Sequence, residues 1–163
     1  MAGPRVSSRA LIICVSVSHG NTAAVARAMA AVLEAEVREP EQVDPQTLTD
    51  YDLVGFGSGI FAGSHHPRLR AYVERLPPVD GTRAFVFTTS GFGRSQSRPW
   101  QRSLGSVLRD KGYDVVGSFD CRGFDTWLPL RLVGGVNKGH PDARDLARAR
   151  TFAERIAGRT AGR

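Results

Sequence analysis

The sequence predicts an α/β fold, a doubly wound sandwich in which a five-stranded parallel sheet carries helices on both faces. Short apolar runs rich in Val, Ile and Phe alternate along the chain with segments of helical period. The runs are nearly continuous in apolar character, which is typical of strands that are buried on both faces. Such strand–helix alternation favours parallel βαβ units with right-handed crossovers.

The strands and helices follow one another in a regular order. Five runs predict strands, and four segments have apolar residues three or four positions apart, as on one face of a helix. We expect one domain over residues 10–158, with short tails at 1–9 and 159–163. The strands are expected at 11–17, 35–38, 53–57, 84–88 and 115–119. The helical faces are expected to contain Val25, Met29 and Val32; Leu69, Tyr72, Val73 and Leu76; Trp100, Leu104, Val107 and Leu108; and Leu146, Ala149, Phe152 and Ile156. The segment 39–50 is only weakly periodic.

Composition narrows the class of protein. The 163 residues are 41% hydrophobic and 23% charged, and no apolar run approaches the ~20 residues that a membrane-spanning helix needs. The two cysteines are too few for a disulfide scaffold, so we expect reduced thiols in a cytoplasmic protein. The net charge of +6 favours anionic partners. No zinc-finger or RNA-recognition spacing accompanies it, so we expect no nucleic-acid partner and no metal.

Four loops follow predicted strands and have the same composition. They cover residues 16–22, 57–63, 89–94 and 121–126, and are rich in glycine, hydroxyls and aromatics with almost no carboxylate. In a doubly wound sheet, ligands bind outside the carboxyl ends of the strands. These loops therefore predict a binding site with little acid–base machinery.

The first loop, Ser16 to Thr22, leads directly into a helix, and two interpretations of it stay open. Backbone N–H groups and the positive end of the helix dipole would converge there on a phosphate, assisted by the Ser18 and Thr22 hydroxyls. Equally, Ser18 or Asn21 could simply cap the first helical N–H groups. The loop contains no lysine, so the Lys-bearing phosphate loop of nucleotide hydrolases is absent.

Other ligand classes on the same architecture fail on specific residues. A receiver domain needs an aspartate at the end of the third strand, where Gly57-Ser58-Gly59 stands. The letters Gly57-x-Gly59-x-x-Ala62 match the dinucleotide fingerprint, but no helix opens directly after them. No serine occupies a G-x-S-x-G elbow, so a hydrolase would lack its nucleophile.

Taken together, the motifs resemble the flavodoxin family over about residues 11–156. The resemblance rests on the order and spacing of five stretches. It implies the strand order 2-1-3-4-5 and a non-covalently bound FMN. The stretches are Ser18-His19-Gly20-Asn21-Thr22, Asp52-Leu53-Val54-Gly55-Phe56-Gly57-Ser58-Gly59-Ile60-Phe61, Thr89-Ser90-Gly91, Cys121-Arg122-Gly123-Phe124-Asp125-Thr126 and Gly134-Gly135-Val136-Asn137-Lys138-Gly139.

The resemblance also implies which residues bind FMN. The first loop would hold the phosphate, and the second and third loops would line the two sides of the isoalloxazine. Gly59 or Gly63 would let a backbone carbonyl turn toward N5 of the ring. Phe61, Phe92 and Trp127 are candidates for stacking on it, and ordinary packing is their alternative role. The expected cofactor-binding residues are Ser16, Ser18, His19, Gly20, Asn21, Thr22, Ser58, Gly59, Ile60, Phe61, Ala62, Gly63, Ser90, Gly91, Phe92, Gly93, Arg94, Cys121, Gly123 and Phe124.

The chain departs from the family pattern in two respects. Val17 stands where the first hydroxyl of the phosphate loop is usual, so Ser16 replaces it only if the loop is rewound by one residue. The familiar electron-carrier flavodoxins are strongly acidic, whereas this chain is basic.

Three functions are compatible with these residues. The first is an FMN electron carrier between a reductase and a partner enzyme, and the second is an FMN-dependent oxidoreductase acting directly on a quinone or an aromatic biosynthetic intermediate. The third is a flavin-free interaction domain. For the second function, His65, His66 and Arg94 are the catalytic candidates, and residues 125–141 would either cover a substrate pocket or dock a partner.

Overall fold

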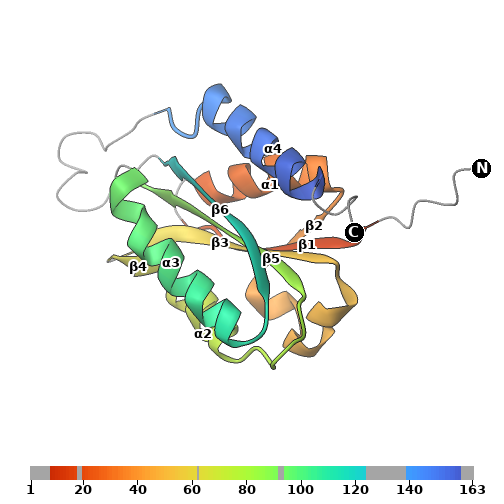
Figure 1. Ribbon diagram of the computed structural model, residues 1–163. Coiled ribbons are helices and arrows are strands. Elements are labelled where there is room, and N and C mark those ends of the chain that lie inside the picture. The colour runs from red at the N-terminus through yellow and green to blue at the C-terminus, as the bar shows by residue number, and fades with distance from the viewer. Residues whose placement is uncertain (1–7, 18–19, 62, 92–93, 124–138, 159–163) are drawn as a thin grey trace, which may run out of the picture.

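A computed structural model describes residues 8–17, 20–61, 63–91, 94–123 and 139–158 (Figure 1). Its centre is a parallel sheet in the order β2-β1-β3-β5-β6, and β4 pairs antiparallel with the end of β3. With β4 set aside, this is the predicted order 2-1-3-4-5. The strands are β1 (Ala10–Val15), β2 (Glu36–Arg38), β3 (Leu53–Phe61), β4 (Ser64–His65), β5 (Arg83–Ser90) and β6 (Asp114–Arg122).

Four α-helices cover the two faces of the sheet, as Figure 1 shows. One pair, α1 and α4, lies on one face, and the other pair, α2 and α3, lies on the opposite face. This is the arrangement expected when right-handed crossovers wind in both directions from the first strand. The helices are α1 (Asn21–Leu33), α2 (Pro67–Glu74), α3 (Arg94–Asp110) and α4 (Ala143–Gly158).

Each face of the sheet has its own hydrophobic core. On the α1/α4 side, Ile12 and Phe85 pack with Val25, Met29 and Phe152. The opposite core contains Ile13, Phe56, Leu69, Tyr72 and Leu108. The apolar helical faces predicted from the sequence point into these two cores, except for Trp100, whose ring lies beside Gly63.

Two glycines of β3 admit aromatic rings from β5. A Cβ placed on Gly55 would lie 2.3 Å from Cζ of Phe85, and one placed on Gly57 would lie 2.2 Å from Cζ of Phe87. No side chain fits beside rings held that close. Neighbouring strands are thus matched glycine to phenylalanine at the centre of the sheet.

Several segments differ from the sequence-based expectation. β1 ends at Val15 rather than at residue 17, and β5 and β6 continue to Ser90 and Arg122, beyond the predicted ends at 88 and 119. The third strand continues four residues beyond its predicted end at residue 57, and then turns back into β4. The weakly periodic segment 39–50 forms two short 3-10 helices, Pro40–Gln42 and Pro45–Asp50. Each begins with a proline, whose fixed φ suits the first helical position, and the Asp44 side chain caps the second by accepting from the N–H of Gln46.

Both cysteines are free and buried, as expected for reduced thiols. Burial raises the pKa of Cys14 to about 12, so this thiol is protonated and unreactive at neutral pH. Among the described residues, no helix is long and apolar enough to cross a membrane.

Candidate functional site

The loop after β1 ends in a turn that only glycine adopts easily. Gly20 precedes the first residue of α1 with φ +66°, and nothing lies within 4 Å of the position of its missing Cβ. Ser16 accepts a hydrogen bond of 3.2 Å at Oγ from the N–H of Ala23, in the first turn of the helix. The positive end of α1 therefore faces this loop, with one of its N–H groups already satisfied by a serine.

Val17 lies beside this turn and faces solvent. The residue is 65% exposed, and no other large hydrophobic residue in the described part of the chain faces solvent to this extent. The residue that replaces the usual hydroxyl of the phosphate loop thus contributes an apolar surface, and Ser16 supplies a cap to the helix.

The ends of two strands meet at Thr22. Its hydroxyl and that of Thr89 share a hydrogen bond of 2.7 Å, and both residues are buried. A Cβ on Gly59 would lie 3.8 Å from both hydroxyl oxygens. The ends of β3 and β5 therefore contact the beginning of α1.

The end of β6 joins the same group. The N–H of Gly123 donates to the carbonyl of Ser90 at 3.0 Å. A Cβ on Gly123 would lie only 2.7 Å from Nδ2 of Asn21, so any side chain there would displace Asn21. All four predicted loops thus contribute residues to one carboxyl edge, which we define as the group Asn21, Thr22, Gly59, Thr89, Ser90 and Gly123.

The buried side-chain amide of Gln101 connects two of the strands that lead to this edge. Gln101 of α3 donates from Nε2 to Oγ1 of Thr88 at 2.9 Å and to the carbonyl of Phe119 at 2.8 Å. It thereby links β5 to β6 near the carboxyl ends of both strands. Gln101, Thr88 and Thr89 were not among the predicted site residues, although a glutamine next to an apolar helical face was a signal for such a role.

The hairpin formed by β3 and β4 is closed by two residue pairs, Ile60 with His65 and Phe61 with Ser64. Gly63 turns it at φ +74°. At its base, His65 is 3% exposed and its Nδ1 lies 3.1 Å from Oγ of Ser58. Desolvation by burial, with the Arg70 charge as a smaller cause, lowers the pKa of His65 to about 4.

The other two catalytic candidates occupy helix starts. His66 caps α2, because its Nδ1 accepts from the N–H of Arg68 at 3.2 Å, and burial lowers its pKa. Arg94 is the first residue of α3. Catalysis by His65, His66 or Arg94 stays a prediction, and both histidines have structural hydrogen bonds.

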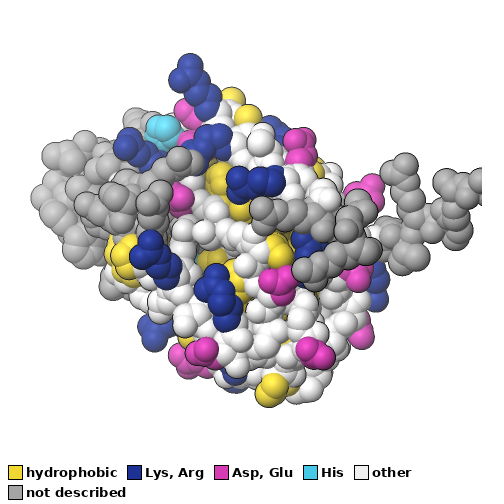
Figure 2. Space-filling model, viewed as in Figure 1, with side chains coloured by type: hydrophobic (Ala, Val, Ile, Leu, Met, Phe, Trp, Pro, Cys, Tyr) yellow, Lys and Arg dark blue, Asp and Glu magenta, His cyan; other side chains and the backbone are white. Residues whose placement is uncertain are grey.

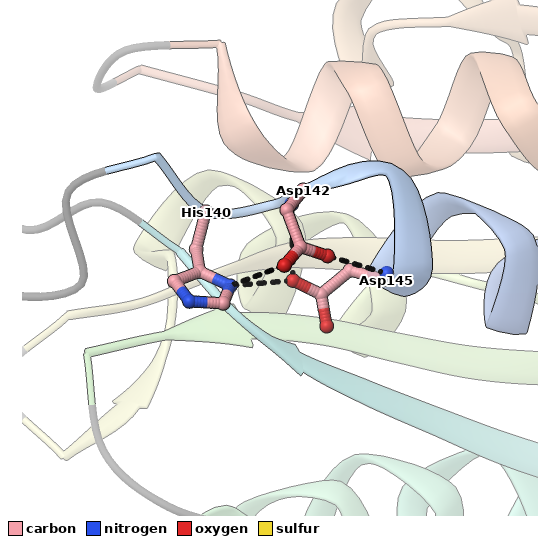
Figure 3. A group of neighbouring side chains, drawn as sticks. All are labelled: His140, Asp142 and Asp145. Atoms are coloured by element: carbon pink, nitrogen blue, oxygen red, sulfur yellow. Dashed lines mark hydrogen bonds and ion pairs between the residues drawn. The ribbon is translucent and has the colours of Figure 1, made fainter.

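A third histidine lies at the start of α4, where Figure 3 shows it with two aspartates. His140 Nδ1 is 2.6 Å from Oδ2 of Asp145, while Asp142 accepts at Oδ1 from the N–H groups of Arg144 and Asp145. These hydrogen bonds lower the pKa of Asp142. Ion pairing and helix capping account for this cluster, the one group of three metal-type ligands found in the described part of the chain.

Several expected cofactor-binding residues lie outside the described residues: Ser18, His19, Ala62, Phe92, Gly93 and Phe124. The side chains of Phe61 and Arg94 also lie outside the description, as does most of the segment 125–141. Ile60, Gly91 and Cys121 are placed at the ends of β3, β5 and β6 beside the carboxyl edge.

Comparisons with known proteins agree with this architecture. A family model described as a flavodoxin domain matches residues 12–115. An uncharacterized protein of Methanocaldococcus jannaschii is 36% identical over 148 residues, which cover 91% of this chain and 97% of that protein.

Solved flavodoxins have the same fold at low identity. Flavodoxin 2 from Bacillus cereus superposes with a TM-score of 0.73 at 18% identity, over 93% of this chain and 99% of its own. A flavodoxin from the domain Archaea gives a TM-score of 0.69 at 18% identity, over 93% and 97%. Since the family model covers more than half of the sequence, the chain belongs to the flavodoxin family.

Proposed function

We propose that this protein binds FMN non-covalently at the carboxyl edge and transfers electrons through it to a partner protein. The flavodoxin family is FMN-binding, and the chain belongs to that family. The observation that carries the proposal is the convergence of four loops on one edge. There the hydroxyls of Thr22 and Thr89 share a hydrogen bond, Gly59 lies beside both of them, and Gly123 lies against Asn21.

The donors of the first loop fit a phosphate. Residues 16–22 contain hydroxyls, an amide side chain and a left-handed glycine at the start of a 13-residue helix, and no acidic residue. Helix N-termini of this kind hold phosphate groups with neutral donors. Ser18, Gly20, Asn21 and Thr22 are our candidates for this end of the site.

The isoalloxazine end is assigned to the hairpin and the end of β5. Residues 58–63 would line one side of the ring and residues 90–94 the other. In support of this, the ends of β3 and β5 are neighbours in the sheet, where Ser58 pairs with Thr88 and Gly59 with Thr89. Bound FMN would supply one- and two-electron redox chemistry. The chain's own contribution is to orient the ring, and Gly63 gives the turn of the hairpin its left-handed conformation.

The surface charge is consistent with an acidic partner. The chain carries a net charge of +6, and Figure 2 shows Lys and Arg side chains spread over the face in view, with Asp and Glu among them. Spread positive charge accelerates encounter with an acidic protein at low ionic strength. We therefore expect reduction of an acidic acceptor to slow as salt is raised.

Reconstitution with FMN tests the proposal. We expect stoichiometric FMN binding, and a loss of affinity of about tenfold or more in Gly123→Val, because the new side chain displaces Asn21. Gly158→Val is the matched control, since nothing lies within 4 Å of its Cβ position. A protein that binds no FMN, or a Gly123→Val variant that binds as tightly as the control, contradicts the proposal.

The same loaded protein separates electron carrier from enzyme. Reduction by a separate reductase, and oxidation by an acidic acceptor protein, are expected of a carrier. Direct bleaching of the flavin by NAD(P)H without any reductase would instead favour the oxidoreductase acting on a small molecule.

A further inference from the structure

The Ser58 hydroxyl, at the base of the β3–β4 hairpin, takes part in three hydrogen bonds. It donates to the carbonyl of Gly59 at 2.9 Å, accepts from the N–H of His66 at 3.0 Å, and lies 3.1 Å from Nδ1 of His65. Ser58 itself is fully buried, with β1 on one side and β5 on the other. The hydroxyl thus links the rigid centre of the sheet to both histidines.

Counting protons fixes the role of each group. A hydroxyl has one hydrogen to donate and two lone pairs to accept with. All three contacts are hydrogen bonds at once only if the hydroxyl donates to Gly59 and accepts from both the His66 N–H and Nδ1 of His65. This arrangement requires His65 to be protonated at Nδ1 and leaves a bare lone pair at Nε2.

The hairpin needs such an anchor. It has only two residue pairs, and an isolated two-stranded hairpin is marginally stable in water. The strand pairing holds its far end, and Ser58 with His65 and His66 holds its base. The residues between, 59–63, are those assigned to one side of the flavin.

We propose that His65 is a positioning residue: it donates from Nδ1 to Ser58 and thereby fixes the hairpin, and the Gly59 carbonyl with it, against the bound flavin. The inference rests on the proposed function for its effect on FMN. It assigns His65 no part in proton transfer, because the residue is buried and its Nδ1 donates to Ser58.

The electrostatics of the ring agree with this role. Burial and the positive charge of Arg70 both lower the pKa of His65, to about 4, so the ring is neutral wherever the protein works near neutral pH. Nε2 is buried and has no hydrogen-bond partner, so in this tautomer it is an unpaired acceptor. An unpaired buried acceptor costs free energy, so any favourable contribution from the polar atoms of the ring comes from the hydrogen bond at Nδ1.

The first test uses the protein without FMN. Nitrogen-15 NMR of the imidazole distinguishes the two neutral tautomers, and we expect His65 to be protonated at Nδ1 at pH 7. Protonation at Nε2 would overturn the inference, whatever the outcome for FMN binding.

The second test compares three variants after wild-type FMN affinity has been measured. His65→Asn keeps an N–H donor at the place of Nδ1, His65→Leu removes it, and Ser58→Ala removes the acceptor. We expect His65→Leu and Ser58→Ala each to weaken FMN binding about tenfold and to shift the potentials of the bound flavin. In His65→Asn both quantities should stay close to wild type. His140→Asn, at a histidine bonded to Asp145 before α4, is the control and should leave both quantities at the wild-type value.

The outcomes separate the two proposals. A wild-type protein that binds no FMN contradicts the proposed function and leaves the NMR test of the tautomer standing. Wild-type affinity and potentials in folded His65→Leu or Ser58→Ala would overturn the positioning role. So would a His65→Asn variant that loses as much as His65→Leu. If His65→Leu does not fold, Ser58→Ala decides.

Discussion

The two central strands, β3 and β5, change character along their length. In the first half, Gly55 and Gly57 lie against the rings of Phe85 and Phe87 with no room for a methyl group. In the second half, the same strands carry buried hydroxyls, Ser58 on β3 and Thr88, Thr89 and Ser90 on β5. One half is held by shape and the other by hydrogen bonds.

The difference shows how one sheet serves two purposes. Close packing between side chains limits the volume that each residue can occupy but does not orient polar groups. Hydrogen bonds between hydroxyls, amides and backbone carbonyls orient the loops that leave the sheet. The apolar half should therefore respond to changes of volume, and the polar half to the loss of a single donor or acceptor.

The largest effect is expected from substitutions in the apolar half of β3 and β5. Phe87→Ala should lower the free energy of unfolding by about 4 kcal/mol, because it leaves a cavity in the α1/α4 core. Gly57→Ala should also destabilise the protein, by about 3 kcal/mol, because its methyl overlaps the ring. Urea-induced unfolding measures both.

The double variant gives the control for this pair. The methyl of Gly57→Ala occupies space that the Phe87 ring vacates, so the two losses should fall short of additivity by about 2 kcal/mol. Additive losses would mean that glycine and ring do not compete for the same volume.

A somewhat smaller effect concerns the polar half and appears with pH. His65 has a pKa of about 4 in the folded protein against an ordinary value of 6.5, so the unfolded chain binds this proton first. Stability should therefore be complete above pH 7 and should fall by about 3 kcal/mol as pH drops to 4. His65→Asn, which cannot titrate, should lack this part of the loss in urea titrations at pH 7.5, 5.5 and 4.5. An equal loss in both proteins would assign it to other groups, among them His66, whose pKa is also lowered.

The smallest effect isolates one hydrogen bond of the carboxyl edge. Thr22→Val or Thr89→Val alone should cost about 1–2 kcal/mol, because each leaves the other hydroxyl buried without this partner. The double variant should be no less stable than either single one, since an apolar pair of the same shape needs no partner. Thermal unfolding of the three variants tests this, and a double variant with the summed loss would show that packing, not hydrogen bonding, holds the pair.

The apolar half could be predicted from sequence and the polar half only in part. Runs such as 53–57 and 84–88 mark their strands because burial on both faces demands apolar residues at every position. The family resemblance then predicted the strand order, which the structure confirms. The first loop was recognised because glycine and hydroxyls there lie next to one another in the sequence.

What escaped prediction depends on partners far apart in the chain. The sequence shows no sign that Thr22 forms a hydrogen bond with Thr89, 67 residues away, or that the Ser58 hydroxyl forms hydrogen bonds with His65 and His66. For the same reason the stretch 58–61 was expected to be loop, since its polar and glycine residues look like loop until their partners are known. Hydroxyls that satisfy one another allow the strand to continue.

The position of α4 has a consequence for how the protein is made. This last described helix packs on α1 and on β6, and the backbone carbonyl of Ile156 accepts a hydrogen bond from Arg83. The sheet covers one part of the apolar side of α1, and α4 covers the part that the sheet leaves open. The helix that begins the carboxyl edge is therefore completely packed only after a segment much later in the chain, near residue 156, has been translated and has folded onto it.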